Sequence, residues 1–315
     1  MERQQTDDVV YQEDFVLNSR GMKLFTCAWR PLNREPKALL FICHGYAMEC
    51  SITMNSTATR LAKAGFAVYG IDYESHGKSE GLSAYIKNFD DLVDDVSAHY
   101  SAICEKEENK GKMRYLLGES MGGAVVLLLH RKRPDFWDGA VLVAPMCKIA
   151  DEMKPHPVVI SVLTKLSRLI PTWKIVPGND IIDVAFKEPK VRQQVRENKY
   201  CYKGKPRLKT AHELLRVSLD LEKNLQEISM PFIVLHGEDD KVTDKSISKL
   251  LYDVASSSDK TFKLYEKMWH GLLYGEPPEN TEIVFGDIIR WLDDRVNGRL
   301  ESELKLNHDA LLKHK

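Results

Sequence analysis

Short apolar runs alternate with longer amphipathic stretches along most of the chain. Runs such as residues 38–43 and 232–235 are entirely apolar, as expected of strands buried on both faces of a parallel sheet. The runs predict strands at residues 13–19, 24–31, 38–44, 67–72, 113–118, 140–144, 232–235 and 261–265. The amphipathic stretches predict helices at residues 57–64, 89–108, 121–133, 243–255 and 281–296. This order is typical of an α/β fold with a mostly parallel, eight-stranded sheet flanked by helices.

The alternation stops between residues 145 and 222, where the pattern predicts no strand. This segment has its own apolar stripe, formed by Val158, Val159, Val162, Leu163, Leu166, Leu169 and Ile170. It is either an ordinary extra helical layer or a cap over the carboxyl edge of the sheet, where ligands bind in open α/β folds. Because the strand pattern resumes afterwards, we interpret the segment as a helical cap inserted after the sixth strand.

The resulting domain organisation is a core of residues 1–145 and 223–296 with a cap of residues 146–222. Residues 297–315 form a polar C-terminal tail, which we expect to be a frayed helix or disordered. A single α/β unit with an insertion accounts for a chain of 315 residues without a second independent domain.

Composition narrows the possible classes of partner and compartment. Hydrophobic residues make up 43% of the chain and charged residues 29%, and the net charge of -1 gives no reason to expect a nucleic-acid partner. Six cysteines without Cys-x-x-Cys pairing predict neither a disulfide framework nor a metal site. The N-terminus lacks the apolar core of a signal peptide, and no run of about 20 apolar residues is present. We therefore expect a cytoplasmic protein.

The motif Gly118-Glu-Ser-Met-Gly carries the chemistry of the chain. An apolar strand at residues 113–117 leads into it, and an apolar helical stretch follows Gly123. Strand, tight turn and helix are the context in which Gly-x-Ser-x-Gly forms a nucleophile elbow rather than an ordinary turn of small residues. The elbow exposes the serine hydroxyl above the sheet, at a helix N-terminus that favours developing negative charge. Ser120 is therefore the candidate nucleophile.

The serine needs a base, which follows it in this type of site. His270 lies just after the last predicted strand, whereas His236 precedes the candidate acids. A loop histidine packed on Trp269 is the alternative interpretation of His270. Order and placement favour His270 as the base.

The candidate acids lie in Gly237-Glu-Asp-Asp, directly after a predicted strand. Carboxylates at such a corner often cap the next helix, as Asp244 could do. One carboxylate must instead face His270 and hold its tautomer. We select Asp240 over Asp239.

The tetrahedral intermediate of acyl transfer needs two backbone N–H donors. One donor is expected from Met121, the residue after the nucleophile. The second is expected from Tyr46 in His44-Gly-Tyr-Ala, the loop that follows an early strand. A plain strand-ending turn is the alternative for this loop, and the adjacent elbow favours the oxyanion role.

Together these motifs resemble the plant group of monoacylglycerol lipases, lysophospholipases and caffeoylshikimate esterases in the α/β-hydrolase superfamily. The likeness runs from residue 13 to residue 296. Its marks are Leu24-Phe-Thr-Cys, His44-Gly-Tyr, Met48-Glu-Cys, Gly118-Glu-Ser-Met-Gly-Gly, Ala144-Pro-Met-Cys-Lys, Lys154-Pro-His-Pro, Gly204-Lys-Pro-Arg and Met268-Trp-His. The resemblance implies ester cleavage by a Ser-Asp-His triad without a cofactor or metal, and it supports Asp240 as the acid.

Two positions depart from the family pattern. Ala47 stands where the family reads His-Gly-Tyr-Gly, and Ser75 stands where a glycine is usual between Asp72 and His76. A methyl group at residue 47 restricts the oxyanion loop if the glycine uses a positive φ. Both changes concern substrate preference and efficiency more than the triad.

The sequence favours hydrolysis of a small-molecule ester, most simply a monoacylglycerol or lysophospholipid. The apolar cap stripe could line an acyl channel or contact a membrane surface peripherally. The alternative is a caffeoylshikimate esterase acting on phenolic esters with the same triad. Two further hypotheses are an acyltransferase, in which an alcohol replaces water, and a hydrolase-fold protein that binds a ligand without turnover.

Overall fold

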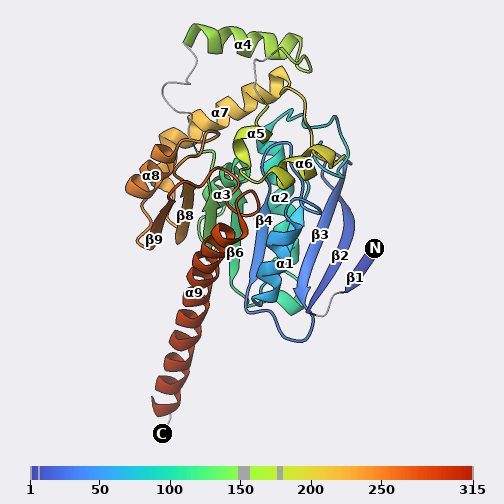
Figure 1. The fold of residues 1–315 in the computed structure, drawn as a ribbon. Coiled ribbons are helices and arrows are strands. Elements are labelled where there is room, and N and C mark those ends of the chain that lie inside the picture. The colour runs from blue at the N-terminus through green and yellow to red at the C-terminus, as the bar shows by residue number, and fades with distance from the viewer. Residues whose placement is uncertain (1, 6–7, 148–156, 176–179, 314–315) are drawn as a thin grey trace.

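The structure is a computed structural model that describes residues 2–5, 8–147, 157–175 and 180–313 (Figure 1). Within these residues nine strands form one sheet, in the order β1-β2-β3-β5-β4-β6-β7-β8-β9. The strands are β1 (Glu2–Gln5), β2 (Val9–Leu17), β3 (Lys23–Pro31), β4 (Leu39–Cys43), β5 (Ala67–Ile71), β6 (Arg114–Glu119), β7 (Gly139–Val143), β8 (Phe232–Gly237) and β9 (Lys260–Tyr265). Strands β2 to β9 match the eight predicted from the apolar runs, which confirms the α/β class.

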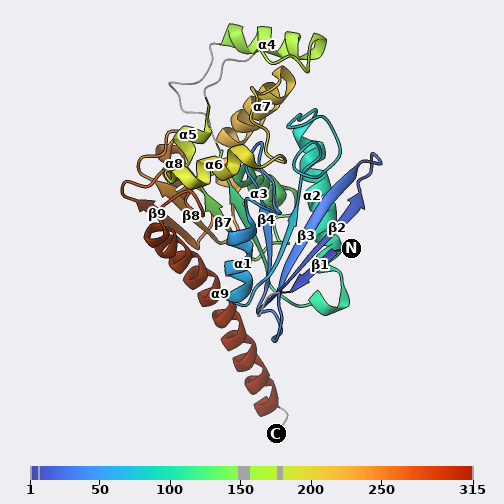
Figure 2. The ribbon, with the colours of Figure 1, turned by 45° about the vertical axis from the view of Figure 1, so that its right-hand side comes forward.

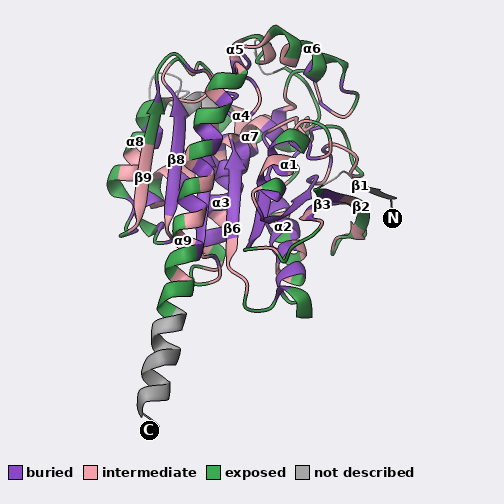
Figure 3. Ribbon diagram, turned by 60° about the horizontal axis from the view of Figure 1, so that its bottom comes forward, coloured by how far each residue is buried: buried purple, intermediate pink, exposed green. Residues whose placement is uncertain are grey.

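Strands β4 to β9 are parallel to one another, whereas β1, β2 and β3 extend one edge of the sheet in antiparallel pairing. Every residue of β4, β5, β7 and β8 is buried, and β8 is purple along its length in Figure 3. Cys43 pairs with Gly118, so that β4 and β6 end side by side. The loop after β4 therefore lies next to the motif after β6.

Helices cover both faces of the sheet (Figures 1 and 2). On one face pack α1 (Asn55–Lys63) and the first part of α9 (Pro278–Lys313). On the other face pack α2 (Phe89–Cys104), α3 (Met121–Lys132) and α8 (Lys245–Val254). The parallel strands thus have apolar layers on both sides, which explains why they are apolar at every position.

Between β7 and β8, the described residues form helices and no β-strand. The helices are α4 (Pro157–Leu169), α5 (Ile182–Ala185), α6 (Pro189–Glu197) and α7 (Leu208–Asn224), followed by the 3-10 turn η3 (Leu225–Glu227). Helix α4 packs on α7, and both lie above the sheet in Figure 1. Val217 and Leu221 of α7 belong to the main core, so α7 joins this segment to the sheet layers. Lys148 and residues 154–156, which belong to two of the family motifs, lie outside the described residues.

Some elements differ in extent from the prediction, and one strand was not predicted. Strand β1 was not expected, because its sequence Glu-Arg-Gln-Gln has no apolar pattern, and it forms only by pairing with β2. The predicted helix 89–108 ends at Cys104 and is followed by the short 3-10 turn η1 (Glu107–Asn109). Helix α9 continues to Lys313 instead of ending at Val296, since residues 297–313 are rich in the helix formers Leu, Glu and Lys. No helix in the described part of the chain has the length and apolarity needed to cross a membrane.

Candidate active site

Ser120 occupies a strained turn between β6 and α3. Its backbone has φ 54° and ψ -119°, a conformation that costs a non-glycine residue on the order of 1–3 kcal/mol. Gly118 and Gly122 permit this turn because the backbone packs too closely around them for a side chain. A Cβ atom on Gly122 would lie 1.9 Å from the Cys43 oxygen, and one on Gly118 would lie 2.4 Å from the Gly122 oxygen. The sequence therefore folds into the elbow geometry that its glycines predict.

One candidate oxyanion donor is the residue after Ser120, and the other lies in a turn that packs against Ser120. Met121 is the first residue of α3, where backbone N–H groups have no partner within the helix. Tyr46 lies in the turn of residues 45–48, which is closed by a 3.2 Å hydrogen bond from the Met48 N–H to the Gly45 oxygen. A Cβ atom on Gly45 would lie 3.6 Å from the Ser120 Cβ, so this turn packs against the nucleophile.

Ala47 adopts the left-handed conformation for which glycine is the usual residue. Its φ is 64°, as expected for the third residue of a type II turn. Ser75, the second departure from the family pattern, has φ 69°. An alanine in this region costs about 1–2 kcal/mol. The methyl group thus restricts a backbone with positive φ, and the Ala47 oxygen is further held by the Tyr202 N–H at 2.9 Å.

Asp240 faces His270 and is held on both of its oxygens. Its Oδ2 lies 2.7 Å from His270 Nδ1 and also accepts from the Thr243 hydroxyl at 2.9 Å. Its Oδ1 accepts the backbone N–H groups of Val242 at 2.7 Å and Thr243 at 3.1 Å. Asp239, the alternative acid, has an exposed side chain. The structure therefore brings Asp240, and not Asp239, to His270.

Asp240 and His270 shift each other's pKa values. Burial favours the neutral acid, but the charge of His270 and hydrogen bonds from His236 and His270 outweigh it and hold the pKa of Asp240 far below its ordinary value. Burial also opposes a charged imidazole, but Asp240 and, to a lesser extent, Glu119 hold the pKa of His270 above its ordinary value. Asp240 is consequently ionised at neutral pH, which orients the imidazole with a proton on Nδ1 and leaves Nε2 as the acceptor.

A pocket of about 450 Å³ contains both Ser120 and His270 in its lining. The loop after β4 forms one wall, and residues between β7 and β8 form much of the rest. Its apolar lining includes Met48, Ile181, Ile182, Phe186, Val195 and Leu214. The pocket therefore joins the candidate nucleophile and base to a space suited to an apolar substrate group.

The sequence analysis did not assign a role to Glu119 or Tyr274. Both residues line the pocket, and the Tyr274 hydroxyl donates a 3.0 Å hydrogen bond to Glu119 Oε2. Burial raises the pKa of Glu119 to about 7, with His270 and Tyr274 acting in the opposite direction. The only sequence signal was the charged residue inside the Gly-x-Ser-x-Gly motif.

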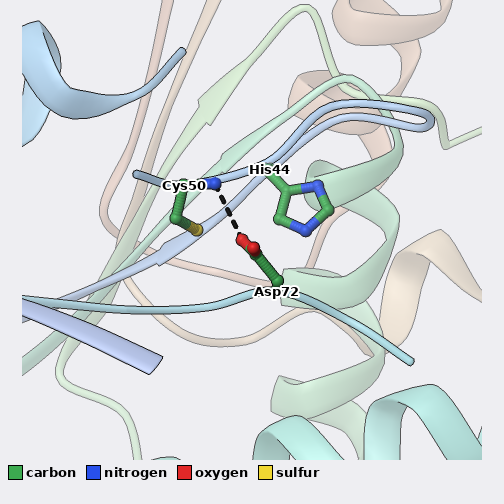
Figure 4. Close-up of side chains that lie close together, drawn as sticks. All are labelled: His44, Cys50 and Asp72. Atoms are coloured by element: carbon green, nitrogen blue, oxygen red, sulfur yellow. Dashed lines mark hydrogen bonds between the residues drawn. The ribbon is translucent and has the colours of Figure 1, made fainter. Parts of the chain in front are cut away.

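A second cluster, His44, Cys50 and Asp72, supports the loop after β4 (Figure 4). The potential metal-ligand atoms of these three buried residues lie within 4.8 Å of one another. Asp72 accepts the backbone N–H groups of Cys50 at 2.8 Å and Lys78 at 2.9 Å, and the His44 ring stacks on Tyr73. Burial and the nearby Glu49 raise the pKa of Asp72 to about 7. Through these contacts the cluster supports the conformation of the loop after β4.

Fold and site together define a serine hydrolase with the α/β-hydrolase fold. The family model described as serine aminopeptidase, S33, matches residues 34–278, and the chain belongs to this family.

The caffeoylshikimate esterase of Arabidopsis thaliana is 36% identical to the chain over 297 residues, covering 92% of the chain and 90% of the relative. The human monoglyceride lipase is 30% identical over 296 residues, covering 93% and 94%. A solved soluble variant of the Saccharomyces cerevisiae monoglyceride lipase superposes with a TM-score of 0.80 at 20% identity, covering 92% of the chain and 97% of that structure. The solved structure shows the fold, and the family match and the two relatives identify the chain as a carboxylic ester hydrolase. The family resemblance drawn from its motifs is therefore confirmed.

Proposed function

We propose that Ser120, His270 and Asp240 form the triad of this hydrolase. His270 Nε2 takes the hydroxyl proton as Ser120 attacks the ester carbonyl, and Asp240 stabilises the resulting imidazolium. The backbone N–H groups of Met121 and Tyr46 stabilise the oxyanion of the tetrahedral intermediate. His270 then protonates the leaving alcohol, and a water molecule releases the acyl group by the reverse sequence. The 2.7 Å contact between His270 and Asp240, in a pocket shared with Ser120, carries this proposal.

The proposed substrate is a monoacylglycerol or lysophospholipid, whose acyl chain lies in the apolar pocket. Residues 146–222 act as the cap in this proposal, since Ile181, Phe186 and Tyr202 of that segment line the pocket together with Ser120. An acyl chain gains about 0.8 kcal/mol for each methylene group that it buries. Apolar cap residues beside the nucleophile therefore support a lipid ester over a small polar one.

A phenolic ester such as caffeoylshikimate is the second candidate. The 36% identity to the Arabidopsis thaliana esterase favours it, and so do Lys203 and Lys205, which line the same pocket. Their ammonium groups would donate hydrogen bonds to the hydroxyl and carboxylate groups of a shikimate alcohol. The acyl pocket would then hold an aromatic acid instead of an aliphatic chain.

A substrate comparison separates these candidates. With purified protein, kcat/KM is expected to be at least about tenfold higher for a medium-chain monoacylglycerol than for caffeoylshikimate, because only the acyl chain extends along the apolar wall. A Lys205→Ala variant is expected to keep its kcat/KM for the monoacylglycerol within about twofold, since the glycerol is uncharged. Preference for caffeoylshikimate, lost in Lys205→Ala, would instead establish the phenolic-ester function.

We also propose that the cap contacts membranes peripherally. Leu169 at the end of α4 is 78% exposed and Trp173 is 57% exposed, and the cations Lys165, Arg168 and Lys174 are exposed beside them. Exposed apolar and basic side chains together are typical of interfacial segments. This segment lies at the far end of the molecule from the C-terminal end of α9 (Figure 1).

A double substitution of Leu169 and Trp173 by glutamate is expected to reduce binding to vesicles of phosphatidylcholine and phosphatidylserine by at least about tenfold, since two apolar contacts are lost. Co-sedimentation measures the bound fraction. Ile283→Glu on α9, whose side chain is 55% exposed, is the matched control and should bind as the unchanged protein does. Equal losses in both variants, or none in the double variant, would contradict a membrane contact through the cap.

A further inference from the structure

Glu119 is a buried carboxylate beside the proposed catalytic groups. It is the last residue of β6 and directly precedes Ser120, yet its side chain is not required for the elbow, which the glycines create. The residue is only 3% exposed, and it lines the pocket together with His270. A carboxylate is rarely placed in such an environment unless it is paired or serves a chemical role.

Its partner, Tyr274, comes from the segment that also carries His270. The Tyr274 hydroxyl lies 3.0 Å from Glu119 Oε2, and the Tyr274 ring packs on Phe186 with ring centroids 5.5 Å apart. Burial and the charge of Glu119 raise the pKa of Tyr274 well above its ordinary value, so its hydroxyl stays protonated and donates the hydrogen bond. The ring contact fixes the direction from which this donor approaches.

Titratable groups from three segments of the described chain influence this pair. On the catalytic side, His270 and Glu119 each influence the other's titration. Cys201 on the cap side and Glu49 in the loop after β4 also raise the pKa of Tyr274. Asp240 lies on the Nδ1 side of the imidazole, and Glu119 is a second negative charge that raises the pKa of the same ring.

We propose that Glu119, held by Tyr274, is a positioning residue that gives the imidazolium of His270 a second electrostatic support. The inference rests on the proposed triad. As the proton of Ser120 moves to His270 Nε2, positive charge develops on the imidazole, and both carboxylates stabilise it in a site where charges interact more strongly than in water. The hydrogen bond from Tyr274 favours the ionised form of Glu119 over the protonated one.

Two variants that weaken this support are expected to move the acid limb of the pH profile in opposite directions. Glu119→Gln removes the charge and keeps an acceptor for Tyr274, so it lowers the pKa of His270 and moves the acid limb of kcat/KM to lower pH. The rate on the high-pH plateau is expected to fall about tenfold, the effect of one pKa unit of lost interaction. Tyr274→Phe removes only the donor and raises the pKa of Glu119. Because the full rate requires ionised Glu119, its protonation at a higher pH moves the acid limb of kcat/KM to higher pH. On the high-pH plateau Glu119 is ionised, and the rate there stays within about twofold.

The measurement is kcat/KM for a soluble chromogenic ester as a function of pH, with thermal melting to verify folding. Glu266→Gln, an exposed carboxylate screened by solvent, is the control and should leave the limb unchanged. Shifts of the same sign in both variants, or an unshifted limb in Glu119→Gln, would overturn the proposed support. Loss of activity in Ser120→Ala together with an unshifted limb refutes this inference alone, whereas an active Ser120→Ala refutes the proposed triad.

Discussion

Replacing Ser120 by alanine is expected to lower kcat for ester hydrolysis by about 10⁵-fold or more, leaving only the rate that the oxyanion donors and binding supply. The fold should persist, because the backbone of Ser120 makes the structural contacts. Its N–H donates to the Val143 oxygen at 2.9 Å, and its oxygen accepts from Gly123 and Met146 at 2.9 Å. Steady-state hydrolysis of a chromogenic ester measures the loss.

Labelling with a fluorophosphonate probe provides the second measurement. The unchanged protein should react, Ser120→Ala should not, and Ser97→Ala in α2 should react normally as a matched control. Labelling of the unchanged protein also excludes a hydrolase-fold protein that binds a ligand without turnover. Retention of near-normal turnover by Ser120→Ala would mean that the nucleophile is another residue.

The parts of the fold that the sequence predicted well are those in which local pattern and burial agree. Strands β4 and β8 are apolar at nearly every position because helices cover both of their faces, and this is visible without the structure. Strand β1 is polar and exists through its pairing with β2, in which Glu2 is opposite Glu13. No pattern within residues 2–5 could indicate that partner. The prediction left residues 297–315 as either a frayed helix or disordered, because a polar helix lacks the apolar stripe on which the helix prediction relied.

The candidate site divides in the same way. The roles of Ser120 and Met121 could be predicted from the local sequence, since the glycines and the flanking strand and helix determine the elbow. The Glu119 to Tyr274 contact joins residues 155 positions apart, and a charged residue in the motif could equally have faced solvent. The hydrogen bond from the Tyr202 N–H to the Ala47 oxygen is similarly non-local. Contacts of this kind, between residues far apart in the sequence, could be identified only from the structure.

The cap segment and the oxyanion loop are also joined through a buried carboxylate. Glu49, which is fully buried, accepts from the Asn198 side chain at 3.0 Å and from the Thr53 N–H at 2.8 Å. Together with the Tyr202 contact, this bond ties residues 198–202 to the loop that presents Tyr46.

The identity of the acid rests on how Asp240 is held. Its Oδ1 accepts two backbone N–H groups, from Val242 and Thr243, so this position must be occupied by an acceptor. In an Asp240→Asn variant the amide oxygen would consequently take the Oδ1 position, and the NH₂ group would face His270 Nδ1. An NH₂ donor requires a lone pair on Nδ1, which moves the imidazole proton to Nε2 and removes the base that Ser120 needs.

Asp240→Asn is therefore expected to lower kcat by about 10⁴-fold with little change in fold, because a carboxylate and an amide have nearly the same shape. Asp239→Asn is the matched control. Its side chain is exposed, so kcat should stay within about twofold of the unchanged protein. The comparison uses kcat for a chromogenic ester near pH 8, with melting temperatures measured for both variants. Equal losses would leave no reason to prefer either aspartate, and a larger loss in Asp239→Asn would transfer the role of the acid to that residue.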